Sequence, residues 1–145
     1  MPEKETLERA RKDKREGKAA STQAGEFVRE EIEHIREGKH GARSAKQAIA
    51  IGLSKARRAG VKLPPPEKGT ASKETREQAD LSKAKSPAKK KSAKRSRAMS
   101  RVLKREGSSA ASKTALSRHA RSAAAKRSAA SRSRSAKKAA QTRKK

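Results

Sequence analysis

The residues of this chain best suited to chemistry are its lysines and arginines, most of which lie in the carboxyl-terminal half. The 145 residues include 42 Lys and Arg against 15 Asp and Glu, a formal net charge of +27. Residues 81–145 hold 23 of these cations and a single acid, Glu106. Cations at this density neutralise phosphates and release condensed counterions, which gives strong, salt-sensitive binding without sequence preference. The sequence therefore predicts a nucleic-acid partner.

The predicted nucleic-acid-binding residues in this basic tail, residues 86–145, are Lys89, Lys90, Lys91, Lys94, Arg95, Arg97, Arg101, Lys104, Arg105, Lys113, Arg118, Arg121, Lys126, Arg127, Arg132, Arg134, Lys137 and Lys138. The segment Ser86-Pro87-Ala88-Lys89-Lys90 resembles the S-P-x-K turn of histone tails, which presents cations to a narrow minor groove. The other interpretation is a chance Ser-Pro in a linker.

A second predicted phosphate site lies at Gly38-Lys39-His40-Gly41, a G-x-x-G sequence ahead of a predicted helix. The strands of a KH domain are absent, so we expect no KH fold. The helix amino terminus offers free N–H groups, with Lys39, His40, Arg43 and Lys46 around it. The competing interpretation is a turn with ordinary surface cations. The site residues predicted before the tail are Lys39, Arg43, Lys46, Arg57 and Arg58.

Other chemistries are not predicted. The histidines, His34, His40 and His119, show no i, i+4 pair, and the chain has no cysteine, so we expect no metal site and no cofactor. We expect His34 in solvent. No nucleophile–base arrangement is recognisable, so no enzyme activity is expected. The single aromatic residue, Phe27, is expected in a core, which favours duplex backbone contact over base stacking.

The best-defined predicted element is a helix over 44–59. Ser44 and Gln47 fit a capping box, Gly60 suits a left-handed position after the helix, and Val61 would then contact Ala56. The predicted apolar stripe is Ala45, Ala48, Ile49, Gly52, Leu53, Ala56 and Ala59.

A second amphipathic helix is predicted over 21–37, capped by Ser21 or Thr22. Its predicted buried stripe is Ala24, Phe27, Val28, Ile32 and Ile35, and its predicted outer, acidic face is Glu26, Glu30, Glu31, Glu33 and Glu37. The link Gly38–Arg43 is short enough to require an antiparallel helical hairpin, which Val61 and Leu63 would close. Because this core is small, we expect the hairpin to dimerise or to fold on a protein partner.

The predicted fold class is all-α: a small antiparallel helical hairpin with a largely disordered, conditionally helical basic tail. The predicted divisions are a charged amino-terminal helix or arm (1–20), the hairpin head (21–63), a Pro-rich and polar linker (64–85) and the basic tail (86–145). A helix over 3–16 should fray alone, since Leu7 is its only large apolar residue. In the tail, helices over 91–106 and 109–130 are expected to form on a polyanion, whereas 132–145 should stay disordered.

The run GEFVREEIEHIREGKHGARSAKQAIAIGLSKARRAGVKLPPP, within residues 23–66, resembles an uncharacterised family of small basic bacterial proteins. The tail segments KRSRAMSRVLKREG and ASKTALSRHARSAAAKR resemble tails attached to that family's head, and the tail composition is similar to that of linker-histone tails. The resemblance implies a bacterial, cytosolic setting and no established activity.

Taken together, these patterns predict a non-enzymatic, histone-like, nucleoid-associated protein that binds DNA without sequence preference. The alternatives are an RNA- or ribosome-associated basic protein, and a protein-interaction module whose acidic face binds a basic partner. The longest apolar run, residues 48–53, is too short to span a bilayer, so we expect no membrane partner and a cytoplasmic, nucleoid location.

Overall fold

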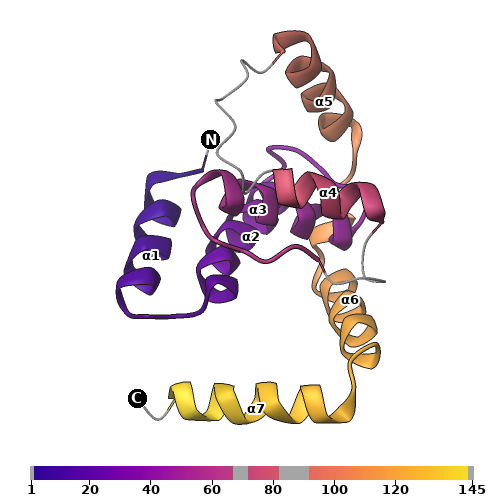
Figure 1. Cartoon of the computed structure of the whole chain (residues 1–145). Coiled ribbons are helices and arrows are strands. Elements are labelled where there is room, and N and C mark those ends of the chain that lie inside the picture. The colour runs from indigo at the N-terminus through magenta and orange to yellow at the C-terminus, as the bar shows by residue number, and fades with distance from the viewer. Residues whose placement is uncertain (1, 67–71, 82–91, 144–145) are drawn as a thin grey trace.

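The computed structural model describes residues 2–66, 72–81 and 92–143, which are helical and contain no strand (Figure 1). The all-α prediction is therefore confirmed for these residues. The helices are α1 Lys4–Arg15, α2 Ala20–Arg36, α3 Ala45–Arg58, α4 Lys73–Leu81, α5 Ala93–Arg105, a turn of 3-10 helix η1 Ser109–Ala111, α6 Lys113–Ala125 and α7 Ala129–Arg143. The predicted S-P-x-K turn, 86–90, lies outside the described residues.

Both predicted ends of α3 are confirmed. Ser44 Oγ accepts a hydrogen bond from the Gln47 amide at 3.2 Å, and the Gln47 side chain accepts one from the Arg43 amide at 2.8 Å. At the other end Gly60 has φ +93°, and the Val61 amide donates to the Ala56 carbonyl at 3.0 Å. The predicted cap of α2 is wrong: the helix starts one residue before Ser21, and its N-cap, Ala19, makes no side-chain cap.

Helices α2 and α3 form an antiparallel pair. Their contacts run from Phe27 beside Ala56 at one end to Ile35 beside Ala48 at the other. The helices meet closely at Gly52, where an added Cβ would lie 2.6 Å from the Val28 Cα. The predicted stripe is buried at its small residues: Ala45, Ala48, Gly52 and Ala56 are buried, Ile49 and Leu53 are half-buried, and Ala59 is exposed.

Helix α1 is part of the head, which corrects the prediction that it frays alone. Ala10 packs into the first core cluster with Ala24, Phe27, Ala56 and Leu63, and Leu7 lies against it. Thr6 and Asp13 on the same helix are also buried. Small and polar residues provide this packing surface, so a search for large apolar residues misses it. The head is consequently a three-helix unit.

The tail is also joined to the head, at a segment in its middle. Ala110 and Ala111 of η1 are buried in a second core cluster with Ile35, Ala42 and Ala48. The Gly41 amide donates to the Leu103 carbonyl at 2.8 Å, and the Ala42 amide donates to the Gly107 carbonyl at 3.2 Å. Arg36 Nε donates to the Ala111 carbonyl at 3.0 Å. The sequence predicts a largely disordered, conditionally helical tail, and it does not predict the docking of residues 103–112 on the head.

Two further helices depart from the predictions. Helix α4 lies where a polar linker was expected, and Ser72 Oγ accepts from the Thr75 amide at its start. Helix α7 occupies residues predicted to be disordered; Ser128 Oγ accepts from the Ser131 amide at 3.2 Å, and Arg127 donates to the carbonyl of Ser131. Alanine-rich composition and a serine cap together favour this helix despite its charge. The predicted helix at 91–106 is present as α5, whereas the predicted helix at 109–130 is divided into η1, α6 and the first residues of α7.

Candidate nucleic-acid interface

The basic residues of α5, α6 and α7 form one class of side chain in this structure: all are exposed. Residues 92–143 contain sixteen Lys and Arg and one acid, and every one of these cations is exposed. Among the described residues, none of the sixteen lies within 4.0 Å of a carboxylate oxygen. We call them the tail cations: Lys94, Arg95, Arg97, Arg101, Lys104, Arg105, Lys113, Arg118, Arg121, Lys126, Arg127, Arg132, Arg134, Lys137, Lys138 and Arg143.

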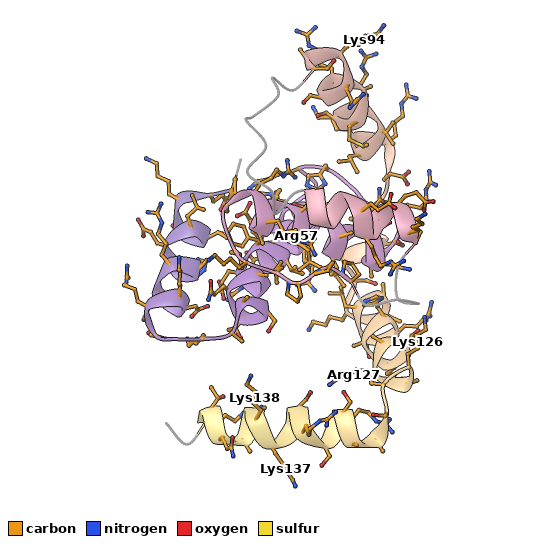
Figure 2. The ribbon with its side chains drawn as sticks, viewed as in Figure 1. Arg57, Lys94, Lys126, Arg127, Lys137 and Lys138 are labelled. Carbon is orange, nitrogen blue, oxygen red and sulfur yellow. The ribbon has the colours of Figure 1, made fainter. Side chains whose placement is uncertain are left out.

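The tail cations occupy three separate helices. Figure 2 shows Lys94 at the end of α5 farthest from the head, Lys126 and Arg127 at the far end of α6, and Lys137 and Lys138 on opposite sides of α7. Lys137 and Lys138 therefore lie on different faces of α7. Of the predicted tail residues, Lys89, Lys90 and Lys91 lie outside the described residues.

The charges of the head, residues 2–66, are arranged differently. It holds sixteen Lys and Arg, seven of which lie in ion pairs, and ten acids, nine of which do. Arg9 Nε lies 2.6 Å from Glu26 Oε2, and Lys18 Nζ lies 2.7 Å from Asp13 Oδ1. The carboxylate of Glu26 raises the pKa of Arg9, chiefly through this hydrogen bond. Arg9 therefore links α1 to α2, and Lys18 holds the loop after α1 against α1 itself.

The predicted phosphate site before α3 is not assembled. Lys39 Nζ lies 3.0 Å from Glu37 Oε2 and 3.3 Å from Glu3 Oε1, and Arg43 Nε lies 3.6 Å from Glu106 Oε1. The amides of Gly41 and Ala42, in the loop before the helix, donate to backbone carbonyls of the tail, and at the helix amino terminus the Gln47 amide donates to Ser44 Oγ. Lys46 is exposed with no ion pair among the described residues. The competing interpretation, a turn with ordinary cations, fits this loop better.

The remaining predicted residues lie at the end of α3. Arg57 is half-buried and its Nη2 donates to the Pro64 carbonyl at 3.4 Å. Arg58 is exposed, with Nε donating to the Ser54 carbonyl at 3.1 Å. Arg57 therefore stabilises the return of the chain after α3, while Arg58 remains on the surface.

The predicted acidic face of α2 is largely an internal ion-pair network, which corrects its assignment as a solvent-facing surface. Glu31 has 0% exposure and Glu30 has 2%. Lys55 Nζ lies 2.6 Å from Glu31 Oε2 and 3.4 Å from Glu30 Oε1. The Glu3 amide, at the start of α1, donates to Glu30 Oε2 at 3.1 Å. Helix α1 and the loop 38–43 cover this side of α2, and partners for the buried carboxylates are then required.

Two histidines join this network, and sequence reasoning missed them. His40 Nε2 lies 3.2 Å from Glu31 Oε1, and His34 Nε2 lies 2.8 Å from Glu3 Oε1. Glu31, His34 and His40 each offer one ligand atom, and these atoms lie within 4.8 Å of one another. The expectation of His34 in solvent is wrong, since its side chain is only 13% exposed. The missed signal is Glu-x-x-His at 31 and 34, which places both side chains on one helix face.

The cluster also perturbs Glu3. The hydrogen bond from His34 lowers the pKa of the Glu3 carboxyl below 4.5, and Lys39 lowers it further. Lys39 has a raised pKa because Glu37, and then Glu3, accept from its ammonium group. These shifts mean that the ionised forms stabilise the contact between the start of α1 and the loop after α2.

Among the described helices, none is long and apolar enough to cross a membrane. No curated protein and no solved structure matches the chain. Residues 4–68 match the model of a family of unknown function (DUF6496). The match begins at α1 rather than at α2, in agreement with a head of three helices, and it ends before the tail. The resemblance to an uncharacterised family is thereby confirmed for this part of the chain.

Proposed function

We propose that this chain binds nucleic acid, duplex DNA in the first place, without sequence preference and without an enzymatic step. The observation that supports this is the contrast between the two halves: seven of the sixteen head cations lie in ion pairs with carboxylates, whereas all sixteen tail cations are exposed and none of them is paired among the described residues. Unpaired cations at this density attract a polyphosphate, and the release of its counterions drives binding. A nucleoid-associated role in a bacterial cell follows from this proposal.

Duplex rather than single-stranded nucleic acid is favoured by the position of Phe27. Platforms for single strands stack bases on exposed aromatic rings. Phe27 is the only aromatic residue of the sequence, and 1% of it is exposed. Contacts to the duplex backbone require only cations, serine hydroxyls and amides, which α5, α6 and α7 provide.

The experiment measures the salt dependence of DNA binding by the full chain and two matched variants. In the tail variant, five α7 cations become Gln: Arg132, Arg134, Lys137, Lys138 and Arg143. In the head variant, five exposed head cations become Gln: Lys4, Arg11, Lys14, Arg15 and Lys62. Both lose the same charge, so they separate the position of the cations from net charge. Circular dichroism checks that helix content is retained.

Fluorescence anisotropy with a labelled duplex, between 50 and 200 mM salt, gives the slope of log Kobs against log salt. Each phosphate contact contributes about 0.9 to this slope, so the tail variant should lose up to about 4.5 and the head variant much less. An equal or larger loss in the head variant would refute the role of the tail. Competition between duplex DNA and structured RNA at matched salt then tests the preference: if RNA competes tenfold better, the partner is RNA.

A further inference from the structure

We propose that Glu31, His34 and His40 form a binding site for a divalent transition metal of the zinc class. Three elements of the head meet there: α2 supplies Glu31 and His34, the loop after it supplies His40, and α3 supplies Lys55 beside the carboxylate. One carboxylate oxygen and two imidazole nitrogens suit Zn²⁺, Co²⁺ or Ni²⁺ and not Mg²⁺ or Ca²⁺, which prefer oxygen ligands alone.

The geometry is close to what such an ion requires. A tetrahedral ion with ligands at about 2.0–2.1 Å separates neighbouring ligand atoms by roughly 3.3 Å. His40 Nε2 and Glu31 Oε1 are 3.2 Å apart, and the three ligand atoms lie within 4.8 Å of one another. The separation of the first two atoms therefore matches the required one, and the His34 ligand atom lies near both.

The buried carboxylate provides an independent indication. Neither oxygen of Glu31 accepts a well-formed hydrogen bond from the described residues, although both are inaccessible to solvent. Lys55 Nζ approaches Oε2 at 2.6 Å, while Oε1 faces the ring of His40. When the proton of His40 is on Nδ1, no donor faces Oε1, which is a costly state for a buried acceptor, and a cation bound at Oε1 supplies the missing partner.

Each imidazole has an acceptor within reach of one ring nitrogen, which can fix the tautomer and leave the other nitrogen unprotonated. His40 Nδ1 lies 3.2 Å from the Gly41 carbonyl, and a proton on Nδ1 leaves the Nε2 lone pair toward Glu31. His34 Nε2 lies 2.8 Å from Glu3 Oε1, and donation to that carboxylate leaves the Nδ1 lone pair free. Hydrogen bonds of this kind from the second ring nitrogen are the usual support of metal-bound histidines.

The local charge also accommodates a divalent cation. The surrounding network contains four carboxylates, Glu3, Glu30, Glu31 and Glu37, against two ammonium groups, Lys39 and Lys55. That leaves two negative charges. A pocket of about 530 Å³, lined by His40, Gly41 and tail residues Lys104, Glu106 and Ser108, gives access to the His40 side of the cluster.

The test uses the full chain, freed of nucleic acid because phosphates bind Zn²⁺ themselves. Isothermal titration with ZnCl₂ should give one site per chain, MgCl₂ should give none, and Zn²⁺ should raise the melting temperature. His34→Gln and His40→Gln should each weaken Zn²⁺ binding by at least about 100-fold, and Glu3→Gln by about 10–100-fold. His119→Gln is the matched control, because His119 lies on α6 and is not part of the cluster. This variant should bind Zn²⁺ as the native chain does.

Nuclear magnetic resonance keeps the proposal falsifiable if a variant loses its fold. In the native chain, Zn²⁺ should shift the ring signals of His34 and His40 and leave those of His119 unchanged. The proposal is overturned if Zn²⁺ does not bind at 100 µM, if it binds equally well to His34→Gln and His40→Gln in folded form, or if the His119 signals shift instead.

Discussion

The junction between the loop 38–43 and tail residues 103–112 gives the sharpest prediction, because this close contact is sterically possible only with glycine at position 41. A Cβ on Gly41 would lie 1.8 Å from the Glu106 carbonyl oxygen and 2.7 Å from that of Gly107. Both neighbours are backbone atoms, so no side-chain rotation relieves the contact. Gly41→Ala should therefore push residues 103–112 off the head.

Two backbone hydrogen bonds set the size of this effect. Displacing the tail breaks the bond from Gly41 to Leu103 and the bond from Ala42 to Gly107. At about 0.5–1.5 kcal/mol each, breaking them reduces the free energy of opening this junction by about 1–3 kcal/mol. The Ala42 amide should consequently exchange with solvent about 5–150 times faster.

Native-state hydrogen exchange on the full chain measures this directly. Gly25→Ala is the matched control, since a Cβ at Gly25, inside α2, meets nothing within 4 Å and should stabilise the helix by about 0.5–1 kcal/mol. Faster exchange at Ala42 in Gly41→Ala alone would support the docked arrangement. If Ala42 exchanges within a factor of two of its native rate in both variants, the reasoning about this junction is wrong.

Two further predictions concern the stability of the head. Phe27→Ala should destabilise it by about 3–5 kcal/mol, because the ring is fully buried. Met99→Ala, at a 56% exposed position, should change stability by less than about 0.5 kcal/mol. Thermal melts followed by circular dichroism compare the two variants, and equal melting temperatures would contradict the assignment of Phe27 to the core. The pKa of Glu3 is lowered by His34, so the stabilisation by its ionised form is present above pH 4.5 and is lost as the pH falls below that value. Urea unfolding at pH 7 and pH 3 measures how much of the free energy of unfolding is lost on acidification, and this loss should be smaller in Glu3→Gln than in the native chain. An identical loss would mean that ionised Glu3 does not stabilise the head.

The sequence allowed the α2–α3 pair to be predicted well, because its signals are local. Ser44 and Gln47 cap α3, Gly60 ends it, and a short link fixes the antiparallel direction. These features depend on residues a few positions apart, and the structure keeps all of them. The predicted tail helices, α5 and α6, rest equally on local propensity and a serine cap.

What could not be predicted depends on contacts between distant segments. Helix α1 packs through Ala10, Thr6 and Asp13, and the tail docks through Ala110 and Ala111. Alanine at these positions gives no periodic apolar signal against an alanine-rich background. The burial of Glu30 and Glu31 follows from the same contacts, since a helical wheel with one partner places both in solvent. The histidine cluster required knowing that His40 folds back over Glu31.

Docking at its middle divides the tail into two charged arms. Figure 1 shows α5 leaving the head on one side, while α6 and α7 extend on the other. Six tail cations lie on α5 and the other ten lie between Lys113 and Arg143. If the tail were anchored only at Pro66, all sixteen tail cations would lie on one flexible segment. The contact at residues 103–112 instead fixes where both arms begin. Under the proposed function, the head therefore sets the separation between two phosphate-binding arms, and Gly41→Ala should alter the geometry of the bound nucleic acid more than the affinity for it.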